Sequence, residues 1–320
     1  MKDDLLRVTV FAPAKVNLTL HVTGQREDGY HTLDSLIAFA TVGDRLEVTP
    51  GNTLSLTCEG PEGQHVPADM ENLIIKVARL FDDITGAAFV LDKQLPVSSG
   101  IGGGSADAAA AFRALMSIRN GGAADDDDAA AHDPGQTPFA ARVLALGADI
   151  PACLLSEVAR MQGVGEKLTV IPDMKGFDAV LVNPRIGVST PQVFAALENK
   201  SNPAMSDALP RFAGLHDFVL WLTEQRNDLQ APAIELVPQI RHVIAALEHD
   251  KDCLLARMSG SGATCFGVFS DGDAANAAAK RLSQANPDWW VRPVRLTSMG
   301  KAARPRVQRH SDENAASLPG

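Results

Sequence analysis

Apolar and polar residues alternate near the start of the chain, which predicts a β-strand with one buried face. The alternating positions are Val16, Asn17, Leu18, Thr19, Leu20, His21 and Val22. A shorter apolar run at 8–11 predicts an earlier strand, which Pro13 is expected to end because proline cannot donate to a ladder. Further strands are expected at 35–42, 44–49 and 53–58.

Apolar residues then recur at helical spacing over 73–84, and Gly86 is placed to end that helix. The second half of the chain mixes both patterns. Helices are predicted near 138–146, 190–199, 212–225, 232–249 and 273–285. Strands are predicted at 167–171, 178–183, 265–269 and 290–296. Strands that are followed by helices and by returning strands predict an α+β fold.

Composition narrows the class of protein. The 320 residues suit two domains better than one, and the 45% of apolar residues suffices for a buried core. A net charge of −10 disfavours general binding to nucleic acid or to an anionic membrane. No stretch resembles a signal peptide or reaches the length of a membrane span. The four scattered cysteines match neither a disulfide framework nor a zinc pattern, so we expect a cytoplasmic protein with reduced thiols.

A glycine-rich segment at 96–106 follows a short apolar stretch at 89–91 and precedes an alanine-rich run of helix formers. Glycine lets a ligand approach the backbone closely, and the first N–H groups of a helix have no partner within it. Ser105 is expected to cap this helix and to offer its hydroxyl to a phosphate or a metal. The order of strand, glycine-rich turn and helix therefore favours a phosphate-binding loop.

Two better-known glycine motifs do not fit this loop. The Walker pattern requires a lysine after its last glycine, and none follows here. The third glycine of the dinucleotide fingerprint would fall at 105, where Ser105 stands. A flexible loop before an alanine-rich helix stays open as the alternative.

Asp149 stands between two apolar segments and has two interpretations. It is either the cap of a helix that begins at Pro151, or a functional carboxylate. The segment 120–137 contains four consecutive aspartates but lacks the spacing of a calcium-binding loop, so we expect a solvated, mobile insertion. The polar and basic last twenty residues are expected to be disordered.

Several segments together resemble the motifs of the GHMP kinases, the superfamily of galactokinase, homoserine kinase, mevalonate kinase and phosphomevalonate kinase. The sequence is most similar to the family within it that serves the non-mevalonate isoprenoid pathway. The segments are Pro-Ala-Lys-Val-Asn-Leu at 13–18, 24–33, 96–106, Leu-Gly-Ala-Asp-Ile-Pro at 146–151, Gly-Val-Gly-Glu at 163–166, and 259–264. The similarity runs from about residue 8 to residue 296.

This resemblance implies a two-domain α+β GHMP kinase fold. The N-terminal domain would be ribosomal protein S5 domain 2-like and the C-terminal domain ferredoxin-like. We place the first at 1–159, with the phosphate loop, and the second at 160–299, which leaves 300–320 as the disordered tail.

The resemblance also implies an ATP-dependent kinase, with Mg²⁺ carried by ATP and no metal site of the protein's own. Asp149 takes the place of the catalytic carboxylate, and Lys15 matches the active-site lysine that keeps it ionised. The residues expected to bind ATP are Lys93, Pro96, Val97, Ser98, Ser99, Gly100, Ile101, Gly102, Gly103, Gly104, Ser105 and Ala106.

The acceptor implied by the resemblance is an alcohol linked to cytidine diphosphate, phosphorylated at the 2-hydroxyl of its methylerythritol. Tyr30, the only tyrosine, offers a face for cytosine, and His31 offers a hydrogen bond. Phe194 is either a second stacking face or a core aromatic. The residues expected to bind the acceptor are Asn17, Tyr30, His31, Thr190, Phe194, Gly260, Ser261 and Gly262. Beyond its small-molecule substrates, the chain is expected to be a monomer or weak homodimer.

Two other functions stay open. Another GHMP kinase of homoserine or mevalonate type is disfavoured by the loop around Tyr30, because those substrates have no base to stack. A non-catalytic ligand sensor is disfavoured by the presence of both Lys15 and Asp149. The phosphate loop departs from the family's usual pattern at Ala106, where a second serine is common, so any hydroxyl contact there falls to Ser105.

Overall fold

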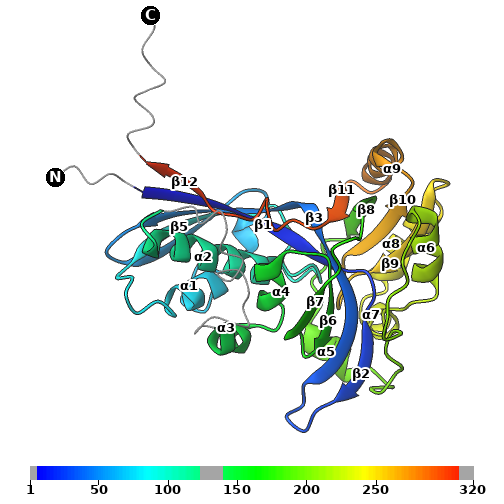
Figure 1. Cartoon of the computed structure of the whole chain (residues 1–320). Coiled ribbons are helices and arrows are strands. Elements are labelled where there is room, and N and C mark those ends of the chain that lie inside the picture. Colours follow the sequence, from blue (N-terminus) through cyan, green and yellow to red (C-terminus); the bar gives the residue numbers. More distant parts are fainter. Residues whose placement is uncertain (1–5, 123–139, 310–320) are drawn as a thin grey trace, which may run out of the picture.

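The computed structural model describes residues 6–122 and 140–309. Two lobes share one continuous sheet, whose strands run in the order β12-β1-β3-β11-β8-β10-β9 (Figure 1). Mixed strands and helices confirm the expected α+β class. Within these residues, no helix is long and apolar enough to cross a membrane.

In the N-terminal lobe, helices pack against one face of the sheet (Figure 1). Its strands are β1 (Leu6–Asn17), β2 (His21–Gln25), β3 (His31–Pro50), β4 (Leu54–Glu59), β5 (Ala87–Asp92) and β12 (Arg306–Arg309). Its helices are η1 (Gly63–His65), α1 (Leu73–Ala78), α2 (Gly103–Arg119), α3 (Ala140–Leu146) and α4 (Ile150–Leu155). Val8 and Val10 of β1 pack with Phe89 and with the alanines at 108–111 of α2, whose small side chains let the helix lie close to the sheet.

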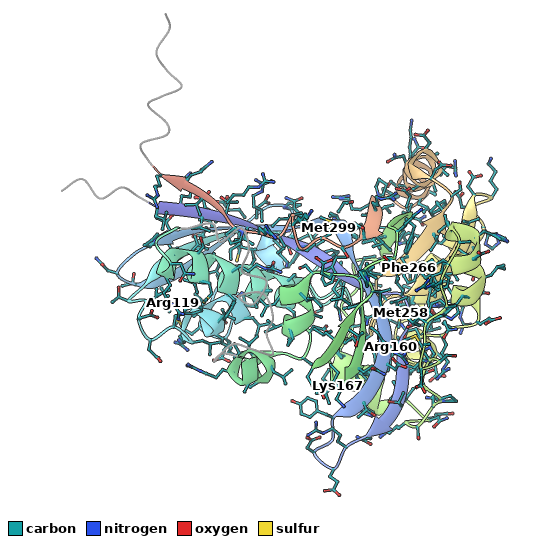
Figure 2. The ribbon with its side chains drawn as sticks, in the orientation of Figure 1. Arg119, Arg160, Lys167, Met258, Phe266 and Met299 are labelled. Atoms are coloured by element: carbon teal, nitrogen blue, oxygen red, sulfur yellow. The ribbon has the colours of Figure 1, made fainter. Side chains whose placement is uncertain are left out.

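The C-terminal lobe buries both faces of its central strands β8 and β10. The strands are β6 (Ala159–Gly163), β7 (Lys167–Val170), β8 (Phe177–Asn183), β9 (Cys253–Met258), β10 (Cys265–Phe269) and β11 (Trp290–Thr297). The helices are α5 (Thr190–Ala195), α6 (Leu215–Thr223), α7 (Gln230–Leu236), α8 (Gln239–Glu248) and α9 (Gly272–Ala285). Figure 2 marks Met258 and Phe266, which are fully buried in separate clusters, the first with α8 and the second with α6.

β3 joins the two lobes, because it pairs with β1, β2, β5, β6 and β11. The two strands expected at 35–42 and 44–49 are therefore parts of one strand. Pro13 does not end the first strand either, because the ladder shifts register between Pro13 and Lys15 and continues. Gly43 lies opposite this irregularity, where a Cβ would come within 2.2 Å of the Ala12 carbonyl oxygen. The bulge thus needs a glycine across from it.

The alternating segment at 16–22 is buried on both faces, so the prediction of a half-buried strand is wrong. β1 ends at Asn17, β2 begins at His21, and Leu20 forms a bridge with Asn227 of the C-terminal lobe. The second lobe covers the face expected to meet solvent. The side chains of Asn17, Thr19 and His21 each make a hydrogen bond inside the protein, although Nε2 of His21 is buried without a partner among the described residues.

The end of the chain also differs from expectation. Arg306–Arg309 pair antiparallel with β1, and Val307 packs on the N-terminal core, so the prediction of disorder is wrong for these residues. The helix expected at 232–249 is two helices separated near Pro238, and β6 and β9 were not predicted. Most of the aspartate-rich segment at 120–137 lies outside the described residues.

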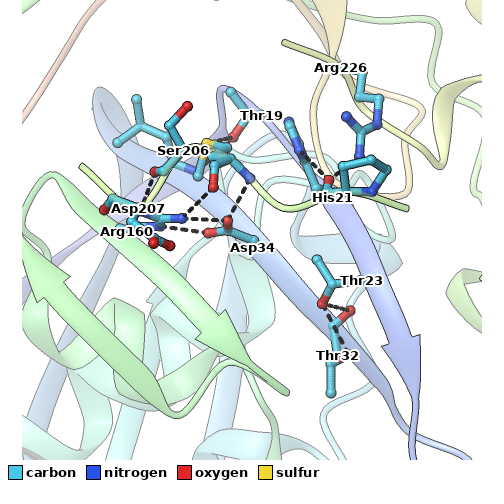
Figure 3. A network of polar contacts seen from close by, with 12 residues as sticks. Thr19, His21, Thr23, Thr32, Asp34, Arg160, Ser206, Asp207 and Arg226 are labelled. Carbon is cyan, nitrogen blue, oxygen red and sulfur yellow. Dashed lines mark hydrogen bonds and ion pairs between the residues drawn. The ribbon is translucent and has the colours of Figure 1, made fainter. Parts of the chain in front are cut away.

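A buried ion pair joins β3, β6 and the segment that follows α5 (Figure 3). Arg160 donates from Nε and Nη2 to the two carboxylate oxygens of Asp34, at 2.8 and 2.7 Å. Its remaining N–H groups donate to the carbonyls of Met205, Ser206 and Asp207. All five guanidinium donors therefore have acceptors, as a buried charge requires.

We expect Arg160→Met to lower the free energy of unfolding by about 3–5 kcal/mol, because Asp34 would stay buried without its cation. Denaturant titration measures the change. The double variant Asp34→Asn with Arg160→Met should recover much of the loss, because neither change then leaves a buried charge unpaired. A single variant as stable as the parent would contradict this role.

Candidate active site

A cleft of about 1350 Å³ opens between β1, the β2–β3 hairpin, the glycine-rich loop and the N-terminal ends of α2, α4 and α5. It brings together almost all of the residues expected to bind ATP or the acceptor. Four of them do not line the cleft: Ile101, Ala106, Gly260 and Gly262. Ile101 and Ala106 are instead buried in the hydrophobic cores.

The glycine-rich loop has the expected order of strand, turn and helix. α2 begins at Gly103, and Gly102 occupies the N-cap position with a φ of +64°, a conformation that favours glycine. The prediction that Ser105 caps the helix is therefore wrong, because the helix starts two residues before it. The unpaired N–H groups of the first turn lie at the cleft, where they suit an anion.

The loop at 259–264 supports the glycine-rich loop by direct backbone packing. Ser259 accepts a hydrogen bond from the backbone N–H of Asn17 and donates its own to the carbonyl of Gly100, both at 3.0 Å. A Cβ at Gly100 would lie 2.6 Å from the carbonyl oxygens of Ser259 and Gly262. Three segments far apart in sequence thus meet at one hydroxyl.

Lys15 and Asp149 form an ion pair, with 2.6 Å between Nζ and Oδ1. The Lys15 side chain is 3% exposed, whereas the Asp149 carboxylate is 38% exposed and faces the cleft. Asp149 sits at the N-cap position of α4, but its side chain makes no capping hydrogen bond. The interpretation of Asp149 as a helix cap is therefore wrong, because its carboxylate binds Lys15 instead.

Lys93 is held between two carboxylates beneath the glycine-rich loop. Its Nζ lies 2.7 Å from Asp44 and 2.5 Å from Asp107, and all three side chains are buried. Burial disfavours the charge of Lys93, but the attraction of Asp107 and Asp44 outweighs it and raises the pKa of Lys93. Because the Lys93 charge is neutralised by two carboxylates, its clearest structural effect is to tie β3 to the first turns of α2.

The hairpin end of the cleft is aromatic. His31 stacks on Phe194 with ring centroids 4.7 Å apart, and Tyr30 beside it is 62% exposed. Phe194 both lines the cleft and packs partly on the C-terminal core, so the two interpretations of this residue are compatible. Nε2 of His31 is buried without a hydrogen-bond partner among the described residues. Burial first, and the charge of Lys200 second, lower the pKa of His31.

Thr190 joins α5 to the loop at 259–264, because its hydroxyl lies 2.7 Å from that of Ser261. Sequence reasoning missed residues that position these loops. Asn227 donates to the carbonyls of Met258 and Gly260, and an isolated asparagine in a loop gives no sequence signal for this. It also missed the opposite wall of the cleft, formed by Val66, Pro67, Asn72 and Leu73.

Comparisons with known proteins place this fold and site in a family. The model for the N-terminal domain of GHMP kinases matches residues 72–157, and the model for GHMP kinases C terminal matches residues 194–288. The chain therefore belongs to the GHMP kinases. A relative from Roseobacter denitrificans, 52% identical over 94% of this chain and 97% of its own length, is a 4-diphosphocytidyl-2-C-methyl-D-erythritol kinase. A protein from Ruegeria pomeroyi with the same name is 50% identical over 89% of this chain and 98% of its own.

A solved structure agrees with these relatives. The crystal structure of a 4-(cytidine 5'-diphospho)-2C-methyl-D-erythritol kinase superposes with a TM-score of 0.68 at 31% identity. The match covers 90% of this chain and 99% of that one. The two-domain GHMP kinase fold is thus confirmed, while the boundary at 159/160 stays a prediction.

Gly104 offers a test of the glycine-rich loop. A Cβ there would meet only the Leu73 side chain, at 3.8 Å, and Gly104 has no positive φ, so Gly104→Val should leave the melting temperature almost unchanged. The new side chain would nevertheless fill the cleft beside the helix N-terminus and weaken ATP binding, measured by calorimetry.

Gly100→Ala is the contrasting variant. Its Cβ would collide with backbone at 2.6 Å and sit at a φ of +73°, so it should lower the melting temperature. If Gly104→Val binds ATP normally, phosphates do not approach this turn.

Proposed function

We propose that the chain catalyses transfer of the γ-phosphate of ATP to the 2-hydroxyl of 4-diphosphocytidyl-2-C-methyl-D-erythritol, in the non-mevalonate route to isoprenoids. The names of the half-identical relatives support this activity. The observation that carries it is the Lys15–Asp149 pair, which lies in one cleft between a glycine-rich helix N-terminus and an aromatic wall. Such a cleft has places for a polyphosphate, a reacting hydroxyl and a base.

In this proposal Asp149 is the general base. Its exposed carboxylate takes the proton from the acceptor hydroxyl while that oxygen attacks the γ-phosphorus. The bond from the γ-phosphorus to the bridging oxygen breaks, and ADP leaves with the electron pair. Lys15 orients the carboxylate and offsets negative charge near the transferring group.

The nucleotide phosphates are assigned to the loop at 96–106, where first-turn N–H groups donate. Lys93 supports this loop from below through Asp44 and Asp107. Mg²⁺ carried by ATP would offset the charge of the phosphates. Ser105 lines the cleft, and its hydroxyl is assigned to contact a phosphate or this Mg²⁺.

The cytosine is assigned to Tyr30, His31 and Phe194, with Asn17, Thr190 and Ser261 between the two substrates. The unpartnered Nε2 of His31 suits a hydrogen bond to the base edge. This wall supports the cytidylyl acceptor over homoserine or mevalonate, and the Lys15–Asp149 pair supports an enzyme over a sensor. We further propose a monomer or weak homodimer, because one chain supplies every residue assigned to the cleft. The cytoplasmic location expected from the sequence also stays a proposal.

The direct experiment is incubation of the purified protein with ATP, Mg²⁺ and one of three acceptors: the cytidylyl polyol, mevalonate or homoserine. ³¹P NMR of the product should show a new phosphomonoester only with the first acceptor. Phosphorylation of mevalonate or homoserine instead would overturn the proposal.

Asp149→Asn should lower turnover by about 10²–10⁴-fold, the usual contribution of a general base. The amide keeps an oxygen acceptor for Lys15 but removes its counter-charge, so the melting temperature should fall, while the KM for ATP should change little at a temperature where the variant is folded. Steady-state kinetics at saturating substrates measure the effect, and near-normal turnover would exclude Asp149 as the base.

Tyr30→Ala should raise the KM for the cytidylyl acceptor about five- to 150-fold, because stacking on a base contributes roughly 1–3 kcal/mol. Tyr30→Phe keeps the flat face and should be mild, and the KM for ATP should not change in either variant. An unchanged acceptor KM in Tyr30→Ala would mean that the base is recognised elsewhere.

A further inference from the structure

Three lysines line the cleft among the described residues, and they differ in their partners. Lys15 is paired with Asp149, and Lys93 with two carboxylates. Lys200 has no carboxylate within 4 Å in the part of the chain that the structure describes. Its Nζ instead contacts the neutral side-chain amide of Gln25, at 3.3 Å from Oε1. Its positive charge is therefore not compensated by an ion pair.

Lys200 lies at the aromatic end of the cleft. It follows α5, which carries Phe194, and it reaches across to Gln25 on β2 of the hairpin. His31 of that hairpin stacks on Phe194 of α5. The hairpin and the α5 side of the cleft therefore touch at two places, at this pair of rings and at the contact between Lys200 and Gln25. The charge of Lys200 also contributes to lowering the pKa of His31, which places the ammonium within electrostatic reach of the ring.

The rest of this lining is poor in positive charge. Asp28, Asp69 and Glu71 also line the cleft, and Lys15 and Lys93 are neutralised by their own carboxylates. A ligand with a diphosphate would bring at least two further negative charges into this space. Without an additional cation, its binding would be opposed by like-charge repulsion.

We propose that Lys200 binds the diphosphate of the acceptor and thereby selects a nucleoside diphosphate-linked alcohol over an uncharged one. This assignment rests on the proposed function and deepens it. An ammonium that holds only a weak amide contact can turn to a phosphate oxygen at little cost, and the new hydrogen bond is charge-assisted. Gln25 keeps the lysine near the ligand until it binds.

The first test compares Lys200→Met with the parent enzyme. Loss of one charge-assisted contact should raise the KM for the cytidylyl acceptor about 10- to 150-fold, while the KM for ATP and the turnover at saturation stay within twofold. Lys200→Arg should keep most of the affinity. Lys251→Met, which removes an exposed lysine that does not line the cleft, is the matched control and should behave as the parent.

Calorimetry with cytidine, CMP and CDP separates charge from shape. The parent should prefer CDP to cytidine, and Lys200→Met should lose that preference while binding cytidine as before. An unchanged preference, or an equal loss for all three ligands, would overturn the assignment. If the parent binds CDP through Lys200 but phosphorylates no cytidylyl acceptor, the proposed function fails and the binding site stands.

Discussion

The contact on which the site depends most is the ion pair of Lys15 with Asp149. A lysine that is almost fully buried is strongly unfavourable without a nearby carboxylate. β1 brings the lysine in from one side after a bulge, and α4 presents the aspartate from the other. Any change that moved β1 against α4 would separate the two charges. The hydrogen bond from the Lys15 backbone N–H to the carbonyl of Ile101 fixes the glycine-rich loop to the same strand.

The sequence predicted the parts whose chemistry is local. The glycine-rich loop could be predicted from its own residues. The pairing of Lys15 with Asp149 could be predicted only from the resemblance to the GHMP kinases. Their contact is confirmed, while their catalytic roles stay proposals. Local patterns failed where distant segments decide the outcome: Asn17 and His21 are buried by a lobe that follows much later in the chain. β12 is likewise ordered only because the edge of β1 is available to pair with it.

The lysines at the two ends of the cleft have different partners. Beneath the nucleotide end, Lys93 is enclosed by carboxylates and serves to hold β3 against α2. In the proposed function, backbone N–H groups, which carry no net charge, face the phosphates there. At the hairpin end, His31 of β3 and Phe194 of α5 provide aromatic rings, and we propose that Lys200 supplies the charge. In the proposed function, recognition of the two phosphorylated ligands is thus divided between the backbone of the glycine-rich loop and the side chain of Lys200.

The unbroken course of β3 has a consequence for motion. A strand that carries the ladders of both lobes offers no hinge, because bending it would break hydrogen bonds on both edges at once. The close backbone packing of Gly100 on the loop at 259–264 resists sliding of the lobes in the same way. Domain closure of the kind that many kinases use is therefore unavailable to this architecture. In the part of the chain that the structure describes, ligands meet a cleft that is already assembled, and the outer hairpin and the surface side chains are the parts expected to adapt around them.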